Sequence, residues 1–137
     1  MRRIAVAAAL LALAACTPPP SQTAAPACVA PLKPALQVDL YFGRGASGRE
    51  VSEAEWAAFL NDEVTPRFPD GLSVVDLRGQ FRHPQGHIER ERTKLLVVVV
   101  FDAPAHGGKI QAIVDSYVRR HGQHSVFRVE RSVCVGF

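Results

Sequence analysis

Six polar side chains give this 137-residue chain its best opportunity for chemistry. They alternate along two predicted strands joined by a Pro84-Gln85-Gly86 turn, so even pairing of the hairpin places all six on one face. Arginine can bind a carboxylate or phosphate through two parallel hydrogen bonds, so four cations beside one carboxylate indicate a pocket for an anion. The alternative is a sheet surface of ion pairs, with Asp76 against Arg92 or Lys94. The six residues are Asp76, Arg78, Gln80, Arg90, Arg92 and Lys94.

Other candidate residues give weaker signals. Arg67, in the loop Pro66-Arg67-Phe68-Pro69, could extend into the anion pocket or bond to nearby carbonyl groups. His83 and His87 flank the hairpin turn, but two ligands without a third make a poor metal site, so we expect no metal and no cofactor. The sequence has no recognisable Ser/His/Asp arrangement, phosphate loop or Cys-x-x-Cys motif, and it therefore assigns no catalytic residue.

The elements that position these residues follow from hydrophobic periodicity. A first helix begins at Ser52, which forms a capping box with Glu55, and Pro66 ends it. A second helix covers 108–121, with Gly122 as its C-cap. Strands are expected at 37–42, 72–82, 88–101 and 125–137, the last with a break at 130–131. The order β-α-β-β-α-β predicts an α+β, ferredoxin-like domain over 35–137, with a four-stranded antiparallel sheet and two helices on one face.

One stretch of the third strand is apolar throughout. The run from Leu95 to Phe101 has the length of a strand buried on both faces and is too short to cross a bilayer. Placing the strand's charged residues on the open face puts its even-numbered aliphatic residues there and its odd-numbered ones against the helices. The even-numbered set is Leu96, Val98 and Val100, and the odd-numbered set is Leu95, Val97 and Val99. Because an uncovered apolar face marks an interface, we expect a homodimer through it, as in dimeric α/β-barrel proteins.

The N-terminus has the pattern of an exported lipoprotein. Arg2 and Arg3 precede an apolar run ending in Leu13-Ala14-Ala15-Cys16, which resembles the bacterial lipobox, with ordinary secretion as the alternative. We predict a lipoprotein signal peptide over 1–15 and acylation of Cys16, which anchors the chain to a membrane. Thr17 resembles the default sorting signal for a Gram-negative outer membrane. The expected location is therefore the cell envelope, facing the periplasm.

Residues 16–34 are rich in proline and alanine and should form an extended tether, or alternatively a ligand for another protein. Loss of Arg2 and Arg3 leaves 14 basic residues against 13 acidic ones, a net charge of +1 that gives no reason to expect nucleic acid. Cys28 and Cys134 form an even pair in an oxidising compartment, which favours a disulfide over two free thiols.

Several short motifs resemble a bacterial family known as domain of unknown function 3574. The resemblance spans nearly all of the domain and implies a small exported or lipid-anchored protein with no assigned reaction. We therefore expect a non-enzymatic binding or interaction domain. The alternatives are an enzyme or ligand-binding domain of the dimeric α/β-barrel type, and a purely structural role. The motifs are Leu40-Tyr41-Phe42-Gly43, Val51–Trp56, Val64–Leu72, Gly79-Gln80, Arg90–Lys94 and Cys134–Phe137.

Overall fold

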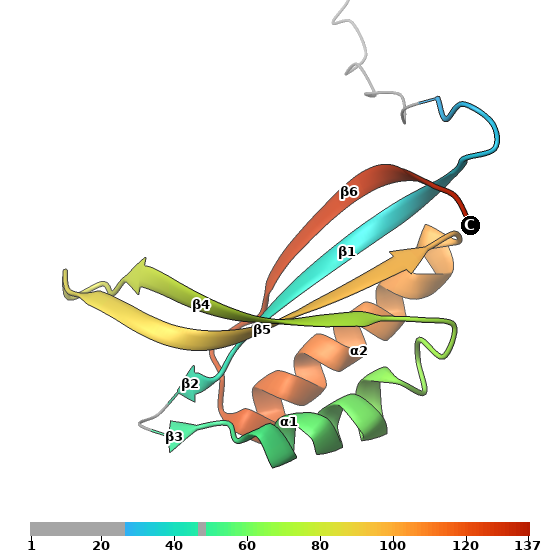
Figure 1. Cartoon of the computed structure of the whole chain (residues 1–137). Helices are drawn as coiled ribbons and strands as arrows, with labels where there is room; N and C mark the ends of the chain where they lie inside the picture. The colour runs from blue at the N-terminus through green and yellow to red at the C-terminus, as the bar shows by residue number, and fades with distance from the viewer. Residues whose placement is uncertain (1–26, 47–48) are drawn as a thin grey trace, which may run out of the picture.

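The computed structural model describes residues 27–46 and 49–137, which form a four-stranded antiparallel sheet and two helices on one side of it (Figure 1). The fold class predicted from the sequence is α+β with this sheet, and it is confirmed. In the sheet order β4-β5-β1-β6, the central strands are β1 and β5. The strands of this sheet are β1 (Lys33–Gly43), β4 (Ser73–Arg82), β5 (Ile88–Val100) and β6 (Phe127–Val135). A small hairpin of β2 (Gly45–Ala46) and β3 (Arg49–Glu50) follows β1.

The start of the first helix and the end of the second lie where their capping residues predict. Ser52 caps α1 (Glu53–Phe59) with the expected capping box, and the helix continues into a π-helical turn, η1 (Leu60–Val64), before Pro66. Helix α2 (Ala103–His121) ends at Gly122 in the left-handed conformation, φ 62°. It begins five residues earlier than predicted, because a proline in the first helical turn gives up no hydrogen bond.

The predicted facing of β5 is wrong. The even-numbered residues Leu96, Val98 and Val100 are buried against the helices, in one core with Trp56 and Tyr117. Val99 lies on the open face and is exposed. The prediction assumed that the charged residues of the strand must lie on the open face. Arg90 and Arg92 do lie on the helix side, but β4 and β5 extend there beyond the helices as a two-stranded ribbon, so their charges reach water (Figure 1).

Strand β6 is continuous, and the break predicted at 130–131 is wrong. Its pairing with β1 runs without interruption from Phe127 to Val135. Arg131 lies on the open face, where its guanidinium forms an ion pair with the buried carboxylate of Asp39 on β1. A charge that finds its partner on the neighbouring strand does not interrupt a strand.

The two ends of the domain meet at one edge of the sheet. The structure joins Cys28 to Cys134 in a disulfide with Cα atoms 5.6 Å apart, beside the register pair Pro34 and Cys134. The predicted signal peptide, Cys16 and most of the tether lie outside the described residues. In the part of the chain that the structure describes, neither helix is long and apolar enough to span a membrane.

Candidate functional site

The β4–β5 ribbon brings all six polar residues of the two predicted strands to one face. Three register pairs place Asp76 opposite Lys94, Arg78 opposite Arg92 and Gln80 opposite Arg90. This is the even pairing that the Pro84-Gln85-Gly86 turn predicts. The pairs differ in their surroundings, because the first lies next to helix α1 and the third lies toward the ribbon tip.

Lys94 is a buried cation with only 4% of its surface exposed. Its Nζ donates to Glu53 Oε2 at 2.8 Å and forms a second ion pair with Asp76. Burial alone would lower the pKa of Lys94, but the hydrogen bonds to the two carboxylates outweigh it and raise the pKa. The same contacts with Lys94 lower the pKa of Glu53 and of Asp76. Lys94 is therefore a charged group that holds α1 against the sheet.

Arg44 is a second buried cation, 3% exposed, which sequence reasoning missed. Its Nε donates to the carbonyl of Val51 at 2.7 Å, and its guanidinium pairs with Glu53 and, at 3.5 Å, with Glu50. The alternation that points Leu40 and Phe42 toward the helices continues for one more step to Arg44. Extending that alternation past the end of the strand would have identified it. We call Arg44, Lys94, Glu53 and Asp76 the inner cluster.

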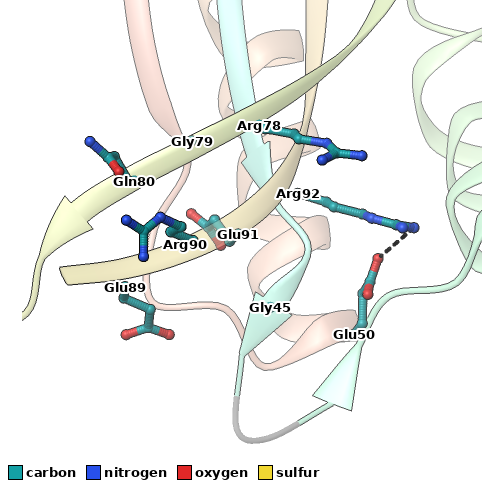
Figure 2. Close-up of a pocket in the computed structure, with 9 residues that line it drawn as sticks. All are labelled: Gly45, Glu50, Arg78, Gly79, Gln80, Glu89, Arg90, Glu91 and Arg92. Carbon is teal, nitrogen blue, oxygen red and sulfur yellow. Dashed lines mark ion pairs between the residues drawn. The ribbon is translucent and has the colours of Figure 1, made fainter.

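Arg78 and Arg92 lie two register positions beyond Asp76 and Lys94 on the same face, and we call them the arginine pair. Figure 2 shows their side chains extended toward the same side, while Gln80 and Arg90 point away from them. Arg92 Nη1 lies 3.6 Å from Glu50 Oε1. Among the residues that the structure describes, Arg78 forms no ion pair. Like charges directly opposite in a sheet repel each other, and this repulsion is only partly compensated here.

Two hollows adjoin the arginine pair. The smaller, of about 230 Å³, lies over the inner cluster, and the larger, of about 560 Å³, lies between the ribbon and the β2–β3 hairpin. The smaller hollow is lined by Arg44, Glu53, Asp76, Leu77, Arg78 and Arg92. The larger one is lined by Gly45, Glu50, Arg78, Gly79, Gln80, Glu89, Arg90, Glu91 and Arg92. Since Arg78 and Arg92 line both, a ligand in either hollow meets the arginine pair.

Glu91 is one of the residues that line the larger hollow, and its carboxylate packs over Gly43. A Cβ atom at Gly43 would lie 2.6 Å from Glu91 Oε2, so the carboxylate occupies the space that a side chain would need. Burial raises the pKa of Glu91, and a hydrogen bond from the Gly45 backbone opposes that shift. On the other side, the hydroxyl of Tyr117 donates to the Gly43 carbonyl at 2.9 Å. The end of β1 is therefore contacted on one side by Tyr117 from the core and on the other by Glu91 at the larger hollow.

Arg67 does not join the site. Its Nη1 donates to the Glu63 carbonyl at 2.6 Å and to Glu63 Oε2 at 2.9 Å, which is the expected alternative of a bond to a nearby carbonyl group, and Arg67 lines neither hollow. The physical reason is that Glu63 lies four residues earlier in η1, where its carbonyl and carboxylate are both within reach.

The two histidines of the ribbon turn stack on each other. The rings of His83 and His87 have centroids 4.6 Å apart. Within the described ranges, no three His, Cys, Asp or Glu side chains gather so that they could hold a metal ion.

The fold and these charges define a small two-layer α+β domain with a charged hollow at one end of its sheet. The family described as Protein of unknown function (DUF3574) matches residues 37–137, and the chain belongs to this family. The resemblance seen in its motifs is thereby confirmed.

Two solved structures share the fold. One is a phage SAM lyase in complex with S-methyl-5'-thioadenosine, which is 13% identical with a TM-score of 0.58, covering 74% of this chain and 88% of that chain. The other is a phage SAM lyase in its apo state, 15% identical with a TM-score of 0.57, covering 74% of this chain and 89% of that chain. At these identities the likeness concerns the fold alone. The comparison with curated proteins finds no match.

Proposed function

We propose that this chain is a lipid-anchored domain of the cell envelope that binds an anionic group through Arg78 and Arg92 without catalysing a reaction. The observation that carries the proposal is the arginine pair itself. Two guanidinium groups stand directly opposite each other, extend to the same side and border both hollows. An anion held between them would turn a repulsive pair into a favourable one.

The charge balance of the site supports an anionic ligand. The residues that line the smaller hollow, together with their ion-pair partners Lys94 and Glu50, supply four cations and three carboxylates. The inner cluster uses its carboxylates on buried cations, and Glu50 is shared between Arg44 and Arg92. Arg78 supplies the charge that is left over, and its planar fork suits a carboxylate or a phosphate. The cations are Arg44, Arg78, Arg92 and Lys94, and the carboxylates are Glu50, Glu53 and Asp76.

Calorimetric titration of the full chain in mild detergent tests this proposal, with inorganic phosphate and N-acetylglutamate as probes. Arg78→Gln and Arg92→Gln should each weaken binding roughly tenfold or more, because each removes a charge-assisted hydrogen bond. Arg82→Gln is the matched control, because Arg82 lies on the same face of β4 but lines neither hollow. Failure of both probes to bind, or equal affinity in all three variants, would overturn the proposal.

A second candidate is a ligand-processing enzyme. The observations that favour it are the fold shared with the phage SAM lyases and Glu91, a carboxyl group with a raised pKa in the larger hollow. Incubation of the chain with S-adenosylmethionine, followed by chromatography for S-methyl-5'-thioadenosine, tests it. Product that forms with the wild type and not with Glu91→Gln would favour the enzyme. No product with either chain would favour the non-enzymatic binding domain.

We also propose that the open face of the sheet pairs with a second copy. This face carries exposed apolar side chains on three strands: Val75 and Phe81 on β4, Val99 on β5, and Phe127 on β6. An apolar face of this breadth marks an interface. Sedimentation of the full chain should give a dimer, and a Val75→Glu, Val99→Glu variant should give a monomer. Ala57→Glu, on an exposed position of α1, should leave the dimer intact.

A further inference from the structure

The end of the sheet opposite the arginine pair exposes large apolar side chains. Val29 is 79% exposed, Leu32 is 42% exposed and Phe101 is 53% exposed, and Phe137 is fully exposed. They form one surface, which we call the apolar end. The rings of Phe101 and Phe137 have centroids 6.1 Å apart, and Leu32 Cδ2 lies 2.7 Å from the position that a Cβ on Gly136 would take.

A shallow hollow of about 280 Å³ adjoins this surface and is also largely apolar. It lies between the start of β1, the end of β5 and the end of β6, so the surface continues from the exposed side chains into the sheet. Its lining residues are Pro34, Ala35, Leu36, Val100, Phe101, Ala103, Ser132 and Val133. In Figure 1 the C-terminus lies near the segment that enters β1, so the start and the end of the described domain lie at this end of the sheet.

The chain enters the domain at this end and is fixed there. The disulfide between Cys28 and Cys134 ties the entering segment to β6. The predicted lipid-bearing residue, Cys16, lies 12 positions before Cys28 in the sequence. A fully extended segment of that length spans at most about 40 Å, so an acylated Cys16 would keep the apolar end close to the bilayer.

We propose that the apolar end rests on the lipid surface, with Val29, Leu32, Phe101 and Phe137 inserted among the headgroups. This inference depends on the lipid anchor of the proposed function. Apolar side chains gathered where an anchored chain enters its domain would leave water for lipid at little entropic cost, because the anchor already holds them near the bilayer. Lys33 lies at the same end and is exposed, which suits an anionic headgroup.

This docking would orient the binding site. Strand β1 runs from Lys33 at the apolar end to Gly43 beside Glu91, and its 11 residues span about 33 Å at the usual rise of a strand. A domain resting on its apolar end would hold the arginine pair that far from the headgroups. The hollows would then face soluble or cell-wall anions, away from the phosphates of the membrane that carries the protein.

Fluorescence quenching by brominated lipid tests the inference. The full chain, expressed with its leader and acylated, is reconstituted into phosphatidylethanolamine and phosphatidylglycerol vesicles whose acyl chains are brominated. Phe101→Trp and Phe137→Trp should show a large loss of emission relative to unbrominated vesicles. The one native tryptophan, Trp56, is buried in the core and should give a constant background.

Phe127→Trp and Phe81→Trp are the matched controls. Both positions are exposed phenylalanines on the same sheet, and both lie far from the apolar end, so their emission should not change. If the chain is retained on vesicles but shows no quenching at positions 101 and 137, the proposed docking is wrong and the lipid anchor is still supported. Equal quenching at all four positions would overturn the orientation. A chain that does not associate with vesicles at all would overturn the anchor and the docking together.

Discussion

The inner cluster and the arginine pair meet on one face of β4 and β5, where Asp76–Lys94 and Arg78–Arg92 are two register positions apart, yet their charges are arranged in opposite ways. In the inner cluster every cation is buried and has a carboxylate beside it. In the arginine pair, two exposed cations face each other. The difference lies in what covers the strands. Where α1 covers the sheet, an unpaired charge would cost several kcal/mol, roughly, so pairing is required. Where the ribbon extends beyond the helices, water tolerates like charges and the positions are free to serve a ligand.

The largest effect is expected from removing a buried member of the inner cluster. Arg44→Ala should lower the free energy of unfolding by about 3 kcal/mol, because it leaves the Val51 carbonyl without its donor and opens a cavity. Urea denaturation followed by circular dichroism measures this. Arg49→Ala is the control, because Arg49 is an exposed arginine five positions away whose pair with Glu55 should contribute less than about 1 kcal/mol. Equal losses of unfolding free energy in the two variants would show that Arg44 in the inner cluster stabilises the fold no more than an exposed arginine does.

The arginine pair should show the reverse behaviour. Arg78→Gln should leave the free energy of unfolding unchanged or raise it by up to about 1 kcal/mol, because it relieves a like-charge contact. The same substitution should weaken phosphate binding. A variant that loses stability as well as affinity would place Arg78 with the inner cluster.

Gly43 tests how rigidly the end of β1 is held. Gly43→Ala forces the Glu91 carboxylate aside, and we expect a loss of about 1 kcal/mol. In a Glu91→Ala background the same substitution should cost much less, since the obstructing oxygen is gone. Thermal denaturation of the four chains of this double-mutant cycle provides the measurement. An equal cost in both backgrounds would show that Glu91 does not occupy the space over Gly43.

The smallest expected effect is on the stability of the inner cluster at acidic pH. The folded pKa values of Glu53 and Asp76 are lowered, first by their hydrogen bonds to Lys94, so the unfolded chain binds more protons. Their contribution to stability is present above the ordinary values of 4.5 and 3.8 and is lost as the pH falls through the folded values. In Lys94→Met the stability should fall less steeply over this range, which denaturation midpoints at a series of acidic pH values would measure.

Glu55 supplies the control for that titration. Hydrogen bonds from Ser52, first from its backbone, and from Arg49 lower the pKa of Glu55 to about 2. None of these groups contacts Lys94. The loss of stability from Glu55 between pH 4.5 and about 2 should therefore be the same in the wild type and in Lys94→Met. If stability falls with pH as steeply in Lys94→Met as in the wild type, Lys94 does not lower the pKa values of Glu53 and Asp76.

Local signals in the sequence were sufficient for most of the fold. The capping box at Ser52 and the glycine at 122 mark helix boundaries through their own side chain or backbone, and the structure retains both. The hairpin register follows from the turn between β4 and β5, so the pairs Asp76–Lys94 and Arg78–Arg92 could be predicted. These features depend on residues that are close together along the chain.

The facing of β5 could not be predicted in the same way. An uninterrupted apolar run has no alternation, so the assignment depended on the charged residues before it. Lys94 is charged and buried, and its burial is compensated by Glu53, which lies 41 positions earlier. Arg44 was missed for a more local reason, because it lies past the predicted end of the first strand and its partners Glu50 and Glu53 belong to the elements that follow. Partners distant in sequence decide which face a charge takes.

The disulfide between Cys28 and Cys134 also determines how the domain responds to force. The two cysteines are 106 positions apart, so nearly the whole folded domain lies inside the loop they close. A pull on a lipid-anchored N-terminus would reach the domain at Cys28 and pass directly to β6, which lies beside β1 in the sheet. The tension is then shared by two adjacent strands, and β1 cannot peel from the sheet one hydrogen bond at a time. While the bond is intact, such a pull would load β1 and β6 together, and reduction of the bond would leave β1 to carry the load alone.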